Sequence, residues 1–416
     1  MLLLECMEKK KVVAIIGGGA AGFFCAVNAA KRNSQLRVII LEKSNKLLAK
    51  VRVSGGGRCN VTNACQSIEE MIKNYPRGQQ FLRKTFHHFF TSDTVDWFTS
   101  RGAHLKTEPD GRVFPVTNSS ATIIECLISE AVKFNVEILT NRRVLNILPV
   151  GSQFELQIEG HPSLLCHYVC VACGGFPKAE MFDWLTRLGH QIEDPAPSLF
   201  TFNLDQHAIT DLQGVVVNDV QIKIAGSQLR ERGPVLITHW GFSGPCILRL
   251  SAWGATELKR RGYEFEININ WLPAESNHEI LAKIQLTREE SGFRSVESKN
   301  PFGLPQRLWS FLVAFSDLSI KTKWAELKAK EQRRLIANIG GSLFKVKGKT
   351  TFKEEFVTAG GLRLSQVDHN TMQSKLIKGL YFAGEILDVD GLTGGFNFQH
   401  AWTSGFLAAK AIANNV

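Results

Sequence analysis

The feature that most constrains this fold is a glycine-rich turn between an apolar strand and a helix of small residues. Residues 12–16 are an all-apolar run of strand length, 20–32 have helical length, and 37–41 are a second apolar run. The turn reads Gly17-Gly18-Gly19-Ala20-Ala21-Gly22 and satisfies the GxGxxG pattern. This order predicts a βαβ unit in a parallel sheet, with a dinucleotide pyrophosphate on the amides at the helix N-terminus.

Each glycine of that pattern has its own physical reason. Gly17 allows a tight turn, Gly19 lets phosphates approach the backbone, and Gly22 lets the helix pack closely on the strand. Glu42 follows the second strand, 20 residues after Gly22, where a carboxylate accepts hydrogen bonds from ribose hydroxyls. An acid at this position disfavours a 2′-phosphate, so we expect FAD or NAD here rather than NADP. The alternative is a glycine-rich turn without a ligand.

A second glycine-rich loop, Ser54-Gly55-Gly56-Gly57-Arg58-Cys59-Asn60, lies shortly after Lys50. Its backbone can approach a planar or phosphorylated ligand, and Lys50 or Arg58 can neutralise phosphate or a flavin anion. We therefore expect a ligand-contacting loop, with a mobile surface turn as the alternative.

A third constellation lies near the C-terminal end. An apolar strand, 379–383, leads into Gly384-Glu385, then Asp388, Asp390 and Gly394-Gly395-Phe396-Asn397, and then a helix to about residue 414. Glu385 can hold ribityl hydroxyls, and helix amides near Asn397 can stabilise negative charge on a reduced flavin. The alternative is an ordinary last strand and helix.

Length and texture predict the domain organisation. The 416 residues suffice for two or three domains. Asp194-Pro195-Ala196-Pro197 is the clearest linker. Residues 199–270 have a sequence pattern typical of β-strands, and residues 276–338 have a helical pattern that is rich in basic residues. The expected domains are 1–195 with 366–416, 196–275 with about 338–365, and 276–337 as a basic helical subdomain. Residues 1–7 are expected to be a disordered extension.

Charge and cysteine content limit the class of protein. The net charge is +10, and residues 276–349 carry 14 Lys and Arg against 7 Asp and Glu. A basic face of this kind is most often a solvated surface, although it also suits nucleic acid. Nine scattered cysteines without paired CxxC spacing indicate reduced thiols in a cytoplasm, and no metal site is expected. No run of about 20 apolar residues is present, so we expect no membrane span.

Several reactive side chains have ordinary interpretations. Cys170 and Cys173 form a CxxC on a strand that enters Gly174-Gly175, so strand packing is expected rather than a redox disulfide. Cys59 lies beside Arg58, which favours a thiolate, but no resolving cysteine is evident. His87 and His88 lack acidic partners at metal-ligand spacing.

The GGGAAG turn, the SGGGRCNVTN loop, the VACGG strand end and the AGEILDVDGLTGGFNFQHAWTSG ending together resemble the aminoacetone-oxidase-like (BaiN/YhiN) flavoproteins over essentially the whole chain. The resemblance implies an α/β fold in which a two-part Rossmann-like FAD-binding domain is interrupted by a β-barrel insertion that carries a small helical domain. Together with the glycine patterns it gives the expected FAD-binding residues: Gly17, Gly19, Ala21, Gly22, Glu42, Lys43, Lys50, Gly57, Arg58, Asn60, Val144 through its backbone, Ala172, Gly174, Gly384, Glu385, Gly395 and Asn397.

The chain also departs from that family pattern. Leu48-Ala49 replaces the Gly-Arg that usually precedes Lys50, so one phosphate or flavin contact is in doubt. His400 stands where an apolar residue is common. Its ordinary pKa makes it a candidate proton donor, with a packed helix residue as the alternative. Arg58 and His400 are the catalytic candidates.

Three functional hypotheses follow. The first is a flavoenzyme in which FAD N5 exchanges a hydride with a small organic substrate or with NAD(P)H. No second GxGxxG exists, so NAD(P)H would visit the flavin transiently, and oxidase and reductase chemistry both stay open. The second is a flavin-dependent protein that acts on or binds RNA through the basic insertion, and the third is a non-enzymatic FAD-holding protein. Substrate identity and oligomeric state are not specified by the sequence.

Overall fold

The computed structural model describes residues 10–350 and 357–415 of the chain. The chain forms two compact units, Met1–Pro197 with Lys353–Val416, and Ser198–Phe352. The expected domain boundaries stay a prediction. The extension expected over residues 1–7 lies outside the described residues.

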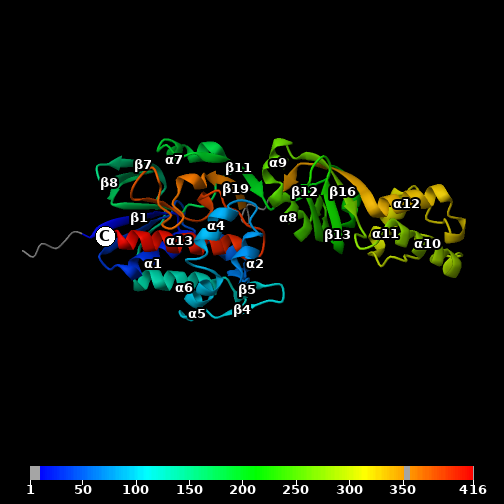
Figure 1. The fold of residues 1–416 in the computed structure, drawn as a ribbon, viewed down its shortest axis with the longest axis horizontal. Coiled ribbons are helices and arrows are strands. Elements are labelled where there is room, and N and C mark those ends of the chain that lie inside the picture. The colour runs from blue at the N-terminus through cyan, green and yellow to red at the C-terminus, as the bar shows by residue number, and fades with distance from the viewer. Residues whose placement is uncertain (1–9, 351–356, 416) are drawn as a thin grey trace, which may run out of the picture. The chain divides into compact units, whose positions relative to one another are not determined.

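A five-stranded parallel sheet is the core of the first unit (Figure 1). Its strands lie in the order β20 (Leu380–Phe382), β10 (Tyr168–Val171), β1 (Lys11–Ile16), β2 (Leu36–Leu41) and β6 (Glu137–Leu139). All neighbouring pairs are parallel. The strand order reverses between β1 and β10, so the loops that follow these two strands meet at a switch point, where α/β sheets bind ligands.

Two helices from opposite ends of the chain pack together in this unit. α1 (Ala20–Arg32) has the predicted bounds, and α13 (Phe396–Asn414) begins one residue earlier than expected. A Cβ built on Gly405 of α13 would lie 2.7 Å from the carbonyl oxygen of Ala21, so the two helices approach backbone to backbone. The other helices are α2 (Ala49–Gly57), α3 (Ile68–Ile72), α4 (Gln79–Thr85), α5 (Thr91–Thr99), α6 (Ala121–Lys133) and α7 (Asp183–Thr186), with 3₁₀ turns η1 (Ala179–Phe182), η4 (Leu364–Gln366) and η5 (Gly384–Ile386).

Smaller sheets complete the first unit. One has the order β3 (Thr62–Asn63), β5 (Arg112–Pro115) and β4 (Leu105–Thr107), and its antiparallel strands β4 and β5 are joined by a turn that contains Asp110-Gly111. A second has the order β7 (Val144–Val150), β8 (Gln153–Ile158) and β9 (His161–Cys166). A third pairs β11 (Ile192–Ser198) with β19 (Val357–Leu362).

The linker predicted at 194–197 is wrong, because these residues belong to β11. Proline lacks an N–H donor and is accepted in strands that have a free edge. In a sheet of two strands, β11 keeps such an edge, so both prolines fit. Proline content alone therefore does not separate a linker from an edge strand.

The second unit is built on a seven-stranded sheet that curls back on itself. Its order is β17 (Ser342–Lys347), β16 (Glu264–Asn270), β13 (Val216–Ile224), β14 (Arg230–Thr238), β15 (Gly241–Ser243), β12 (Thr201–Asn203) and β18 (Lys349–Thr350). The two edge strands, β17 and β18, are separated only by Gly348, so both edges come from successive residues. All neighbouring strands in this sheet are antiparallel, and they lie in the region where the sequence predicts β-structure.

Helices of the second unit share one hydrophobic core with this sheet. Phe344 of β17 stacks on Phe315, with ring centroids 6.0 Å apart. The helices are α8 (Pro245–Trp253), α9 (Ala255–Arg260), α10 (Asn277–Ser291), α11 (Gln306–Phe315) and α12 (Ala329–Gly341), with 3₁₀ turns η2 (Ala208–Leu212) and η3 (Trp324–Glu326). No helix in the described ranges combines the length and apolar character needed to span a bilayer.

The helical pattern predicted for 276–338 is only partly correct towards its end, because α12 begins at Ala329 and residues 321–328 form no α-helix. The residues that precede α12 form backbone hydrogen bonds with the loop that follows α10. Val296 N donates to Thr322 O at 2.8 Å, and Trp324 N donates to Arg294 O at 3.0 Å. These long-range bonds use backbone groups that a helix would need.

Candidate active site

The glycines of the first turn separate into packing positions and an open position. A Cβ on Gly22 would lie 2.0 Å from the carbonyl oxygen of Gly17. Gly17 has φ +113°, and its Cβ would lie 2.5 Å from Ala172 O. Gly19 has no atom within 4 Å of an added Cβ. Gly17 and Gly22 are thus required by the turn and by helix packing, while the space in front of Gly19 is open.

The N-terminus of α1 faces this open position. Gly19 is the N-cap residue and supplies no side-chain hydrogen bond, and the first turn contains no acidic residue. The first amides of a helix lack intrahelical acceptors and carry partial positive charge. The geometry suits an anionic group at Gly19.

Glu42 lies beside this turn, at the end of β2. Its Oε2 accepts from Gly18 N at 2.9 Å, and its Oε1 accepts from Ser44 N and Ser44 Oγ, both at 2.9 Å. Its carbonyl oxygen accepts from Arg142 N at 2.8 Å, just before Val144 begins β7. Glu42 and the Val144 backbone therefore lie along one edge of the site.

The first and last segments of the chain meet at Ala21 and Gly384. A Cβ on Gly384 would lie 2.8 Å from the Cβ of Ala21, and Gly384 adopts φ +74°. Gly384 N donates to Ser404 Oγ at 2.8 Å, which ties it to α13. Two residues predicted from separate motifs are thus in van der Waals reach.

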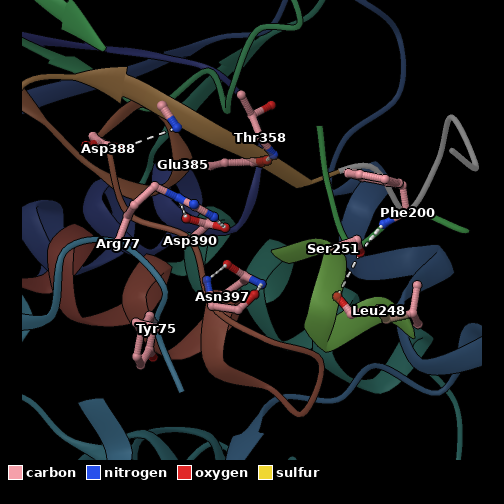
Figure 2. Close-up of polar contacts among 12 residues, drawn as sticks. Tyr75, Arg77, Phe200, Leu248, Ser251, Thr358, Glu385, Asp388, Asp390 and Asn397 are labelled. Atoms are coloured by element: carbon pink, nitrogen blue, oxygen red, sulfur yellow. Dashed lines mark hydrogen bonds and ion pairs between the residues drawn. The ribbon is translucent and has the colours of Figure 1, made fainter. Parts of the chain in front are cut away.

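Glu385 joins three further elements. It forms an ion pair with Lys50. Figure 2 shows Glu385 beside Thr358, whose N donates to Glu385 Oε1 at 2.9 Å. A Cβ on Gly174 would lie 3.8 Å from Glu385 Oε2. The structure thus brings Lys50, Gly174 and Glu385 together.

Asn60 and Gly395 connect the second loop to the start of α13. With its amide oriented to suit its neighbours, Asn60 accepts from Gly395 N at 3.0 Å and donates to Thr62 O at 3.0 Å. Asn397 forms two bonds to Gly391, accepting from its N and donating to its O, both at 2.8 Å (Figure 2). The Asn397 side chain therefore fixes the loop that precedes α13.

The loop that contains Arg58 leaves the helical conformation at Ser54, which has ψ 146°, and Gly55 and Gly56 adopt left-handed angles. Arg58 Nη1 donates to Glu108 Oε1 at 2.7 Å, and its guanidinium lies 4.0 Å from the centroid of Phe114. Gly57 O accepts from Ser120 N at 2.8 Å. The loop is therefore anchored at several points.

The remaining predicted residues lie close to these groups. Ala172 N donates to Ile16 O at 2.8 Å, which places the end of β10 beside the first turn. The ammonium of Lys43 acts electrostatically on the Cys173 thiol and lowers its pKa, against a larger rise from burial. Leu48, one of the departures from the family pattern, has φ +54°, a left-handed conformation that favours glycine.

His400 is buried on α13, and its Nε2 lies 3.2 Å from Gly384 O. Burial lowers the pKa of the imidazole to about 4. At neutral pH the ring is uncharged and can donate one N–H to that carbonyl. Its observed role is to hold the Gly384 turn.

Sequence reasoning found Asp388 and Asp390 without assigning them a role, and it missed Arg77. Both Asp390 carboxylate oxygens accept from the Arg77 guanidinium, and the Asp390 side chain is fully buried (Figure 2). Asp388 accepts from Gly360 N at 3.1 Å, and burial raises its pKa to about 6. The sequence did offer a signal for this pair: Asp388 and Asp390 are acidic residues in a largely apolar segment that has no basic residue nearby.

All cysteines among the described residues are free. Burial raises the pKa of the Cys59 thiol to about 12, overriding any effect of the adjacent Arg58. The pKa of Cys170 is also raised, first through its hydrogen bond with Cys25 and then through burial. These thiols are protonated near neutral pH, which does not favour a redox role.

The residues at this edge of the sheet fit a dinucleotide such as FAD. An open glycine at a helix N-terminus suits the pyrophosphate, a carboxylate at the end of β2 suits ribose hydroxyls, and a cation suits phosphate or a flavin anion. Three segments that are far apart in the sequence supply these groups around the β1–β10 switch point.

Comparison with known proteins agrees with this geometry. The HI0933-like protein Rossmann domain model matches residues 11–411. The chain is 27% identical to a 3-dehydro-bile acid delta(4,6)-reductase of Clostridium scindens over 402 residues, which cover 94% of this chain and 96% of that protein. It is 28% identical over 404 residues to a ribosomal RNA dihydrouridine synthase of Escherichia coli, covering 94% of each.

One solved structure has a comparable fold over nearly the whole chain. This is the 3-ketosteroid-delta4-(5alpha)-dehydrogenase of Rhodococcus jostii RHA1, with a TM-score of 0.51, 13% identity, and coverage of 97% of this chain and 98% of that one. At this identity the likeness concerns the fold alone. Because the family model spans almost the entire chain, the protein belongs to the HI0933-like family of FAD-dependent oxidoreductases.

Proposed function

We propose that this protein is a reductase that saturates a carbon–carbon double bond conjugated to a carbonyl group, with NAD(P)H as the electron donor. The two named relatives support a shared reaction. A 3-oxo bile acid with Δ4,6 unsaturation and the uracil ring of uridine both contain such a bond. The common chemistry is hydride addition to the carbon atom remote from the carbonyl.

The convergence of residues around the switch point carries the proposal. We assign the α1 N-terminus at Gly19 to the pyrophosphate, Glu42 to ribose hydroxyls, and the edge near Val144 to the adenine side. Lys50 and Glu385 would bind the ribityl and phosphate region, and the amides near Gly395 the pyrimidine edge. FAD held by these residues would supply hydride transfer through its N5.

Residues of this chain would hold the cofactor rather than react with it. Neutral His400 donates to Gly384 O and so keeps the Gly384-Glu385 turn in place. Arg58 is proposed to contribute positive charge near the flavin, oriented by Glu108 and Phe114. The free cysteines suit a reducing compartment, so we propose a cytoplasmic location.

The curled seven-stranded sheet supports the finer proposal that the second unit is a β-barrel insertion that carries a helical part.

A second substrate class, RNA, is favoured by one surface of this unit. Phe293 is 73% exposed, and the guanidinium of Arg294 lies 6.0 Å from its ring centroid. Ser295 pairs with Lys323, so further positive charge lies beside it. An exposed ring with adjacent cations is suited to stacking on a nucleobase.

Anaerobic stopped-flow absorbance of the FAD-loaded protein tests the reaction class. We expect NADPH or NADH to bleach the flavin band, and a 3-oxo-Δ4 steroid or a uridine-containing ribosomal RNA fragment to restore it faster than air does. Restoration by the RNA alone would identify the RNA substrate class. If both nucleotides leave the band unchanged while an amine bleaches it, the reductase proposal is wrong and an oxidase replaces it.

A further inference from the structure

A pocket of about 550 Å³ lies in the first unit, outside the residues assigned above to FAD. One wall is formed by α4 and the residues just before it, and the other by the segment 364–375. Its lining residues are Pro76, Gly78, Gln79, Gln80, Phe81, Lys84, Leu364, Ser365, Val367, His369 and Lys375.

This pocket is cationic. The lining contains Lys84 and Lys375 and no carboxylate, and neither lysine forms an ion pair with a described residue. Lys375 Nζ donates to Ser365 O at 2.8 Å, which holds it along one wall and leaves its other protons available. Burial lowers the pKa of His369, and the charges of Lys84 and Lys375 lower it further while Asp368 raises it, so both ammonium groups lie near this lining residue.

The nearest opposing charge is already engaged. Asp368 Oδ1 accepts from Asn370 N at 2.7 Å and from Thr371 N at 3.2 Å. These bonds direct the carboxylate toward its own backbone turn. Asp368 keeps its charge and acts on His369, but two lysines against this one carboxylate leave the pocket with net positive charge, which suits an anion.

The pocket also has the apolar surface that a nucleotide needs. Phe81 and Pro76 on one wall and Leu364 and Val367 on the other accompany the cations. Its volume is far larger than a single phosphate requires and lies in the range of small-molecule sites. Polar groups at a few points and apolar walls between them are typical of sites that bind a ring with attached phosphates.

One wall of the pocket is joined to the segment that follows Glu385. A Cβ on Gly78 would lie 2.6 Å from Cγ2 of Val389, and the adjacent Arg77 is paired with Asp390. The pocket therefore shares a wall with the 388–391 loop, whose position Asn397 fixes through Gly391. Since the chain has no second GxGxxG, a donor nucleotide needs another site within reach of the flavin.

We propose that this pocket binds the phosphate groups of the nicotinamide dinucleotide that reduces the flavin, with Lys84 and Lys375 as the cations and Phe81 beside the adenine. This inference rests on the proposed function, because it assigns the donor of that reaction. Lys84 and Lys375 are binding residues here and take no part in hydride transfer.

The test is anaerobic stopped-flow reduction of the FAD-loaded protein over a range of NADPH and NADH concentrations. In the double variant K84Q/K375Q, we expect the dissociation constant to rise about 10- to 100-fold, while the limiting reduction rate and the flavin spectrum stay unchanged. K378Q removes an exposed lysine outside the lining and is the matched control. If the dissociation constant rises for NADPH alone, the two lysines bind the 2′-phosphate. If it rises equally for NADH, they bind the pyrophosphate.

A wild-type dissociation constant in the double variant, or an equal loss in K378Q, would overturn the inference. The proposed function fails in a distinguishable way, since wild-type flavin would then resist both nucleotides. In that case, titration of the oxidised protein with ADP and with 2′,5′-ADP still tests the pocket: binding of either that weakens in K84Q/K375Q supports the inference, and binding of neither refutes it.

Discussion

Arg77 and Asp390 form a two-point ion pair, in which Nε and Nη2 of the guanidinium donate to separate carboxylate oxygens of a fully buried side chain. The two residues are 313 positions apart in the sequence. Their pairing fixes the 388–391 loop to the residues before α4. Since Glu385 precedes this loop and Asn397 follows it, the pair helps to position the whole last segment of the site.

We expect D390N to destabilise the protein by about 3–5 kcal/mol, because it removes the buried carboxylate charge that accepts two hydrogen bonds from the Arg77 guanidinium. Urea unfolding of the FAD-free protein measures the change. E137Q, which removes an exposed partner of Arg37, is the control and should cost about 1 kcal/mol or less. Equal effects of the two substitutions would contradict the importance of burial at Asp390.

Substitutions at two glycines of the first turn should have different effects, one on FAD binding and the other on stability. G19A places its Cβ in open space, so unfolding of the FAD-free protein should change by less than about 0.5 kcal/mol, while the dissociation constant for FAD rises at least about tenfold. G22A forces its Cβ toward Gly17 O and should cost several times more in stability. Flavin fluorescence titration and urea unfolding measure both quantities. Normal FAD affinity in G19A would remove this site from consideration.

Asp388 should make part of the stability depend on pH. Its folded-state pKa is raised from 3.8 to about 6 by burial, so the native state binds its proton more tightly than the unfolded state does. The wild type should therefore gain up to about 3 kcal/mol relative to D388N as pH falls from about 7 to about 4. Unfolding of both proteins across this range is the measurement. Parallel pH curves would show that the Asp388 carboxyl is not desolvated as described.

His400 should have the opposite effect. Its folded-state pKa is lowered from 6.5 to about 4, so the unfolded state binds its proton more tightly. As pH falls from about 6.5 to about 4, the wild type should lose up to about 3 kcal/mol relative to H400Q. The same unfolding series checks this. If H400Q instead abolished an activity step with an apparent pKa near 7, a proton-donor role for His400 would return.

Much of the first βαβ unit was predictable from the sequence. The bounds of α1, the neighbouring strands and the positions of Gly17, Gly22 and Glu42 follow from local rules, because turn sterics and strand or helix periodicity act over a few residues. The linker at 194–197 was mispredicted for the same reason: proline has the same local preference in a linker as in an edge strand. The start of α12 depended on bonds to a loop some 30 residues earlier.

The sequence alone determined the motifs, their order and the family resemblance, since each is a property of neighbouring residues. Only the tertiary structure decided which groups meet: Ala21 with Gly384, Lys50 with Glu385, and Arg77 with Asp390. It also decided the charge state of His400 and Asp388 and the thiol character of Cys59. The physical reason is that desolvation and pairing depend on what the folded chain packs around a group, and the members of these three pairs lie hundreds of residues apart in the sequence.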